Sequence, residues 1–95
     1  PLRIAVGLAE LGHPVVVHDP KVKAVKGVRM ASTPSVAVRD AAVVVVLNDE
    51  PVYRALGWRR IARIASPGAK VFACSSEIGR AAATQMETTI LGGIT

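Results

Sequence analysis

An unbroken run of valines is the feature that most constrains the fold of this chain. Val43 to Leu47 holds four consecutive valines and a leucine with no polar residue between them. A strand with one solvated face alternates apolar and polar residues, whereas a strand covered on both faces does not. The run therefore predicts a central strand of a parallel sheet with helices packed on both sides, and it places the chain in the α/β class.

Helix-like and strand-like segments alternate along the rest of the chain. Strands joined by helices run parallel with right-handed crossovers, so we expect a three-layer, Rossmann-like domain with a mostly parallel sheet. Residues 88–95 fit neither pattern. The expected helices cover 2–11, 35–42, a segment that Ser66-Pro67-Gly68 ends, and 77–87, and the other expected strands cover 15–18, 28–30 and 70–74.

The first twenty residues look like part of a nucleotide-binding α/β unit. A helix-like run from Leu2 to Leu11 stops at Gly12, and Pro14 leads into a valine strand that ends at Asp19. In a Rossmann domain such a helix follows a first strand and a glycine-rich phosphate loop. We therefore expect residues 1–95 to form a single α/β domain that lacks the usual first strand and glycine-rich loop, as a fragment of a larger protein.

Composition argues against several classes of function. The longest apolar run, Ala41 to Leu47, is far shorter than the roughly 20 residues that span a bilayer, and no signal peptide precedes it, so we expect a cytoplasmic protein with no membrane partner. A single cysteine, Cys74, forms neither an internal disulfide nor a zinc site, so no metal is expected. The net charge of +5 is spread over separate segments without interleaved aromatics, which argues against nucleic acid as a partner.

Polar residues follow the expected strands at their carboxyl ends, where parallel α/β sheets bind ligands. Asp19 stands where a Rossmann acidic residue accepts hydrogen bonds from a ribose, but an aspartate before a proline also shapes a turn. Asn48 and Asp49 follow the valine strand and can hydrogen-bond a nucleotide or a sugar. Asp49 is equally suited to cap a helix that begins near Pro51, so both interpretations stay open.

Ser75 and Ser76 form the third polar strand end. Their hydroxyl and backbone N–H groups suit a phosphate at a helix N-terminus, and capping alone also explains them. His13 and His18 have no serine, cysteine or carboxylate nearby in a triad-like pattern, and Cys74 is best interpreted as a small buried hydrophobe. We therefore expect the polar strand ends to bind substrate and no residue of this chain to be catalytic.

Three motifs are informative when they are taken together. They are Leu8-Ala9-Glu10-Leu11-Gly12, Val17-His18-Asp19-Pro20-Lys21-Val22, and Asn48-Asp49-Glu50 followed by Tyr53-Arg54-Ala55-Leu56-Gly57-Trp58. With the valine strand and the basic helix after it, these motifs resemble the C-terminal domain of the UDP-glucose/GDP-mannose dehydrogenase family, over roughly residues 1–78.

The resemblance implies a function and a set of partners. In that family NAD oxidises a nucleotide sugar twice, to a uronic acid, and this domain binds the nucleotide part of the sugar and closes the active site. It implies a UDP- or GDP-linked sugar as substrate, an N-terminal dehydrogenase domain as partner, and NAD bound mainly by parts of the parent protein outside this chain; a homo-oligomer is left open. The family's nucleophilic cysteine belongs to its N-terminal region, so Cys74 does not take that role.

Two alternatives remain. The family's Asp-Gly-Arg-Asn after the last strand is replaced here by Cys74-Ser75-Ser76-Glu77. Leu11-Gly12-His13-Pro14-Val15 and Pro67-Gly68-Ala69-Lys70-Val71 resemble instead the NAD-binding domain of β-hydroxyacid dehydrogenases of the 3-hydroxyisobutyrate type. A non-catalytic module for nucleotide binding or oligomerisation is the third hypothesis.

Overall fold

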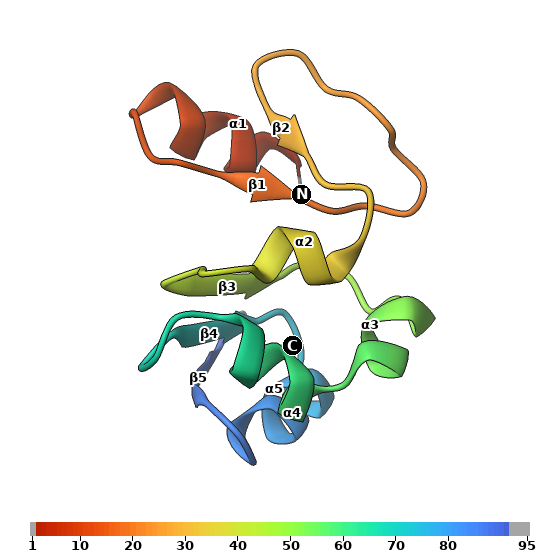
Figure 1. The fold of residues 1–95 in the computed structure, drawn as a ribbon, viewed down its shortest axis with the longest axis vertical. Helices are drawn as coiled ribbons and strands as arrows, with labels where there is room; N and C mark the ends of the chain where they lie inside the picture. The colour runs from red at the N-terminus through yellow and green to blue at the C-terminus, as the bar shows by residue number, and fades with distance from the viewer. Residues whose placement is uncertain (1, 92–95) are drawn as a thin grey trace. The chain divides into compact units, whose positions relative to one another are not determined.

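A computed structural model of the chain describes residues 2–91 and divides into two compact units, Pro1–Ala37 and Val38–Thr95 (Figure 1). Each unit contains helical residues and its own parallel sheet, so the prediction of an α/β fold with parallel strands is confirmed. None of the helices in residues 2–91 is long and apolar enough to cross a membrane.

The first unit begins with α1 (Leu2–Glu10), close to its predicted limits. Gly12 ends this helix, because its φ of 90° lies in the left-handed region that glycine adopts without strain. The N–H of Gly12 donates to the carbonyl of Ala9 at 3.0 Å, and the N–H of His13 donates to the carbonyl of Leu8 at 3.1 Å. This is the Schellman arrangement, so the glycine determines where the helix stops.

Two short strands follow α1 and pair in parallel. They are β1 (Val16–Val17) and β2 (Arg29–Met30). The N–H of Ala31 donates to the carbonyl of Val17 at 2.7 Å, which extends this ladder by one bond. The strands predicted here are present but shorter than expected, and none of their residues is fully buried.

The boundary between the two units falls within α2 (Pro34–Val38). The hydroxyl of Thr33 accepts a hydrogen bond from the N–H of Val36 at 3.3 Å, so Thr33 caps the start of this helix. The helix ends before the predicted limit of 35–42. Asp40, at a φ of 56°, turns the chain out of the helix in a conformation that aspartate tolerates better than most residues.

The second unit contains a three-stranded parallel sheet in which β4 is the middle strand, with β3 on one side and β5 on the other. Helices connect the strands in turn, as expected of consecutive parallel crossovers. In chain order the elements are β3 (Val43–Val46), α3 (Pro51–Leu56), α4 (Trp58–Ile64), β4 (Lys70–Ala73), α5 (Ser76–Ala83) and β5 (Glu87–Ile90).

The core of the second unit is centred on β4. Val71 and Ala73 of this strand have no exposed surface, and the buried cluster around Val71 includes Val44 and Ala82. Trp58 lies partly buried against the same cluster. The fully buried members of this cluster are valines and alanines, so the centre of the core is aliphatic.

The prediction that the valine run lies mid-sheet is wrong for the sheet of the second unit. There β3 pairs only with β4, and Val43 and Val45 are 50% and 41% exposed, whereas Val44 is 6% exposed. The predicted burial of both faces is also wrong in this unit, because the burial of the valines alternates along β3. A run of valines without polar residues carries no information on strand order. Strand order depends on the crossovers that follow, and these put Val71 and its neighbours in the middle.

The end of the described chain also differs from expectation. The helix predicted over 77–87 stops at the end of α5, and the N–H groups of Gln85 and Met86 both donate to the carbonyl of Ala82, at 3.0 and 2.9 Å. The strand β5 then begins within the predicted helix. Its threonines and isoleucine favour extended structure and pair with β4. The strand therefore includes the first residues of the segment 88–95 that the sequence left unassigned. Residues 92–95 of that segment lie outside the described residues.

Candidate functional site

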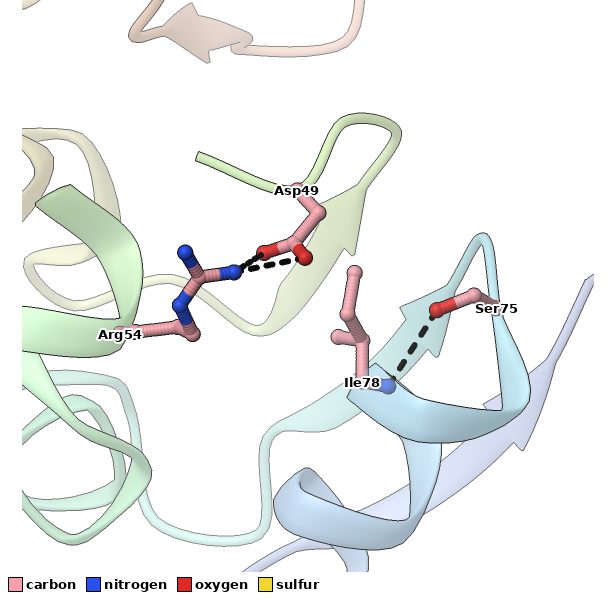
Figure 2. Close-up of polar contacts among 4 residues, drawn as sticks. All are labelled: Asp49, Arg54, Ser75 and Ile78. Atoms are coloured by element: carbon pink, nitrogen blue, oxygen red, sulfur yellow. Dashed lines mark hydrogen bonds and ion pairs between the residues drawn. The ribbon is translucent and has the colours of Figure 1, made fainter. Parts of the chain in front are cut away.

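The carboxyl ends of β3 and β4 lie side by side in the second unit. Val46 pairs with Ala73 in the parallel register, and the N–H of Cys74 donates to the carbonyl of Val46 at 2.9 Å, so the ladder continues to the last residues of both strands. The two polar segments that follow are therefore neighbours at one edge of the sheet. Figure 2 shows Asp49 and Ser75 at these two strand ends.

Asp49 holds the guanidinium group of Arg54. Both carboxylate oxygens accept hydrogen bonds from Nη1 of Arg54 at 2.7 Å (Figure 2). The side chains of Arg54 and Asp49 are 61% and 44% exposed, so solvent screens this ion pair and its net contribution to stability is about 0.2–1 kcal/mol. The pair places a cationic, planar donor group close to the strand ends.

The capping interpretation of Asp49 is wrong. The N-cap of α3 is Glu50, whose side chain makes no capping hydrogen bond, and the proline that follows has no N–H to be capped. The carboxylate of Asp49 instead reaches along α3 to Arg54. Asn48, one residue earlier, is half-buried next to the end of β3.

Ser75 is the N-cap of α5. Its hydroxyl accepts a hydrogen bond from the N–H of Ile78 at 3.3 Å, with the extended backbone that N-cap residues adopt (Figure 2). The capping interpretation of Ser75 is therefore confirmed. Ser76 is exposed at the first position of the helix, where backbone N–H groups have no acceptor within the helix.

Asp19 belongs to the first unit and shapes a turn. Its Oδ1 accepts a hydrogen bond from the N–H of Lys21 at 2.9 Å, and its carbonyl accepts one from the N–H of Val22 at 3.2 Å. The turn interpretation of Asp19 is confirmed. Binding of a ribose by its carboxylate stays a prediction.

Arg54 is the site residue that the sequence analysis missed. It belongs to one of the three motifs, but it received no role because its partner lies five positions earlier, before the start of α3. One pattern in the sequence could have identified it: an aspartate follows the valine strand, and an arginine stands in the helix that comes next. An arginine there suits planar, bidentate recognition of carboxylate or phosphate.

Other chemistry is sparse in the described part of the chain. No group of three or more histidine, cysteine or acidic side chains among residues 2–91 is arranged to hold a metal ion. The thiol of Cys74 is free and only partly buried, which departs from the small buried hydrophobe that was expected. A hollow of about 390 Å³ lies at the opposite, amino end of the sheet, beside Lys70 and Glu87, away from the end where parallel α/β sheets bind ligands.

A scan of protein-family models, a search of curated proteins and a search of solved structures each found no match to this chain. The interpretation of the site therefore depends on the strand order, the Asp49–Arg54 pair and the capped start of α5. These features define the candidate site used below: Asn48, Asp49, Arg54, Ser75 and Ser76.

Proposed function

We propose that the chain is the C-terminal, nucleotide-sugar-binding domain of an NAD-dependent UDP-glucose/GDP-mannose dehydrogenase, which oxidises a nucleotide sugar to a uronic acid. The observation that carries the proposal is the pairing of the strands in two parallel groups, β1 with β2 and β3-β4-β5. The resemblance of the sequence motifs adds the substrate class. The chain binds the nucleotide, and the parent protein supplies the catalytic residues.

The pairing pattern supports a Rossmann-like sheet without its first strand. A doubly wound sheet has the strand order 3-2-1-4-5-6, so its second and third strands pair with each other and its fourth, fifth and sixth strands form another group. The strands of this chain pair in the same two groups, in the same chain order and all in parallel. In the chain, α1 precedes β1, as the first crossover helix of such a sheet precedes its second strand.

The candidate site has groups suited to a nucleoside diphosphate. The amide of Asn48 offers a donor and an acceptor for a base or ribose. The guanidinium of Arg54 can exchange its contact with Asp49 for a phosphate oxygen at small cost, because the ion pair is exposed. The N-terminus of α5 adds unpaired N–H groups and the positive end of the helix dipole on the neighbouring strand end.

Titration of the intact protein with UDP, GDP and NAD tests this function. We expect UDP or GDP to bind at the candidate site and Arg54→Gln to weaken that binding, while Arg63→Gln, an exposed arginine of α4, leaves it unchanged. The intact protein should also reduce NAD when the matching nucleotide sugar is added. A protein that binds neither UDP nor GDP contradicts the proposal.

The second candidate is the NAD-binding domain of a β-hydroxyacid dehydrogenase. It is favoured by the turn at Pro67-Gly68, where Gly68 has a φ of 77°, and by the two serines that follow the next strand, β4, after Cys74. This candidate predicts that NAD protects the amides of Ser75 and Ser76 from exchange and that UDP does not. Nucleotide binding by the intact protein without any turnover would point instead to a non-catalytic module.

A further inference from the structure

One face of α4 carries three arginines that no acidic side chain neutralises. Arg59, Arg60 and Arg63 are exposed, and none of them forms an ion pair with another residue among 3–91. An α-helix turns about 100° per residue, so the three lie within about 100° of its circumference. Ile61, on the opposite side of the helix, is buried. The three arginines therefore form one patch turned to solvent, called the arginine face below.

The arginine face is unfavourable for α4 itself. Arg59 and Arg60 lie in the first turn, where the positive end of the helix dipole disfavours cations, and that turn has no acidic residue. Arg63 suits the dipole in the last turn, but it lies four positions after Arg59 and three after Arg60, the spacings at which like charges repel. The helix α5 has the favourable arrangement, with Glu77 in its first turn and Arg80 in its last. A local rule broken without a compensating contact is typical of a functional surface.

The kind of cation on this face favours a protein partner. The helices α3 and α4 contain arginine and no lysine, whereas lysines supply the basic connection of the first unit at Lys21, Lys23 and Lys26. Surfaces that attract phosphate backbones or lipid headgroups use lysine and arginine alike. Protein–protein interfaces are enriched in arginine and depleted in lysine. The planar guanidinium explains this preference, because it binds a carboxylate through two hydrogen bonds and is more weakly hydrated than an ammonium group.

Other occupants fit this face less well. A second copy of the chain brings the same excess of positive charge, a net +5, so it offers poor complementarity. A membrane surface requires an apolar helix face beside the cations, and in α4 Ile61 is buried within the unit. Nucleic acid held by three phosphate contacts alone gives weak binding that depends strongly on salt. Charge complementarity therefore points to carboxylates on another protein.

We propose that the arginine face of α4 binds an acidic surface of a partner protein. The partner presents glutamate or aspartate side chains on one face, and these carboxylates accept hydrogen bonds from the guanidinium groups of Arg59, Arg60 and Arg63. The arginine face shares no residue with the candidate site. The inference therefore goes beyond the proposed function and does not depend on it.

Two synthetic peptides test this proposal on the intact protein. Both are helical, are built from alanine and glutamine, and carry three glutamates. The matched peptide has its glutamates at positions i, i+3 and i+4, on one face, whereas the dispersed peptide has them at i, i+5 and i+6, evenly around the helix. We expect the matched peptide to bind about tenfold more tightly than the dispersed one in calorimetric titration. Equal affinities, or no binding of the matched peptide, would overturn the inference.

A triple variant locates the binding on α4. It combines Arg59→Gln, Arg60→Gln and Arg63→Gln, and its matched control combines Lys21→Gln, Lys23→Gln and Lys26→Gln, which removes the same net charge from the first unit. The triple arginine variant should lose at least about tenfold in affinity for the matched peptide, and the lysine control should keep it. Equal losses in both variants would show nonspecific attraction and overturn the inference.

Two further probes decide between classes of partner. They are a DNA duplex of about 20 base pairs and vesicles that contain phosphatidylserine, each titrated at physiological salt. We expect both to bind more weakly than the matched peptide. Tighter binding of either probe, lost in the triple arginine variant, would assign the arginine face to nucleic acid or to a membrane and overturn the inference.

Thermal unfolding separates a binding role from a structural one. Glutamine has a helix propensity close to that of arginine, so the triple arginine variant should unfold at the same temperature as the unmodified protein or higher, because repulsion is relieved. A midpoint lowered by several degrees would show that the arginines stabilise α4, and it would overturn the inference. Nucleotide titration reports on the proposed function separately: Arg54→Gln should weaken only UDP or GDP, and the triple arginine variant only the matched peptide.

Discussion

The two units differ in what holds them together. Every buried apolar side chain among residues 3–91 lies in the second unit, where Val71 is fully covered. In the first unit large apolar residues stay exposed, Leu11 at 76% and Ile4 at 51%. Packing around a central strand therefore stabilises the second unit, whereas capping and turn hydrogen bonds account for more of the order in the first. Matched substitutions in the two units test this difference.

The largest effect is expected from core truncation. Val71→Ala should lower the free energy of unfolding by about 2–3 kcal/mol, because the cavity it leaves is enclosed, whereas Val16→Ala in the half-buried β1 should cost less than about 1 kcal/mol. The loss in Val71→Ala is measured by urea unfolding. The fluorescence of Trp58 reports this transition, because Trp58 packs against the core of the second unit. The loss in Val16→Ala is measured by amide hydrogen exchange across β1. Equal losses would remove the contrast between the units.

The same substitution at two helical glycines should have opposite signs. A methyl group at Gly79 in α5 would meet Cγ1 of Ile90 and lie 2.8 Å from its Cδ1, so Gly79→Ala forces Ile90 to move and should cost about 1–2 kcal/mol. A methyl group at Gly7 in α1 meets nothing within 4 Å, so Gly7→Ala should stabilise the helix by about 0.5–1 kcal/mol. Thermal unfolding of both variants measures the difference. A stabilising Gly79→Ala would show that β5 packs more loosely than described.

Loss of a helix cap should give a smaller effect. Ser75→Ala should cost about 1 kcal/mol, because the N–H of Ile78 loses its acceptor at the start of α5. Ser75→Asn keeps a side-chain acceptor and should restore most of the loss. Thr33→Ala removes the corresponding cap of α2, a shorter helix, and should cost about half as much. Exchange of the Ile78 and Val36 amides reports each cap, and a larger loss at Thr33 would contradict this ranking.

Much of the local structure could be predicted from residue chemistry. Gly12 marked the end of α1 because only glycine enters the left-handed region freely, and Ser75 marked the start of α5 because its hydroxyl can accept a backbone N–H. Such signals act within a few residues of the chain. They were sufficient to place the end of α1 and the start of α5, but not the ends of α2 and α5.

Strand order and side-chain pairing could not be predicted in the same way. The valine run indicated burial, but the middle position went to β4 because both neighbouring strands pair with it. The contact of Asp49 with Arg54 depends on the start of α3 at Pro51, which the sequence pattern left uncertain. The limit of α5 was also missed, since alanine-rich sequence continues the helical pattern up to residues that pair as β5.

Arg54→Gln should have the smallest effect on stability and a clear effect on binding. Its ion pair with Asp49 is exposed, so the free energy of unfolding should fall by less than about 1 kcal/mol. If the guanidinium contacts a phosphate, affinity for UDP or GDP should fall about tenfold, which corresponds to one charge-assisted contact. Arg54→Lys keeps the charge but loses the planar donor pair and should restore only part of the affinity.

Arg63→Gln is the matched control for Arg54→Gln, because it removes the same charge from the exposed surface of α4 in the same unit. Nonspecific attraction of the nucleotide by the net positive charge would lower affinity equally in both variants and would be screened by salt. Direct contact at the candidate site lowers affinity only for Arg54→Gln, and the loss persists at high ionic strength. Unchanged binding in Arg54→Gln would mean that the carboxyl edge of β3 and β4 does not hold the phosphates, although the pairing of the strands in the second unit would stand.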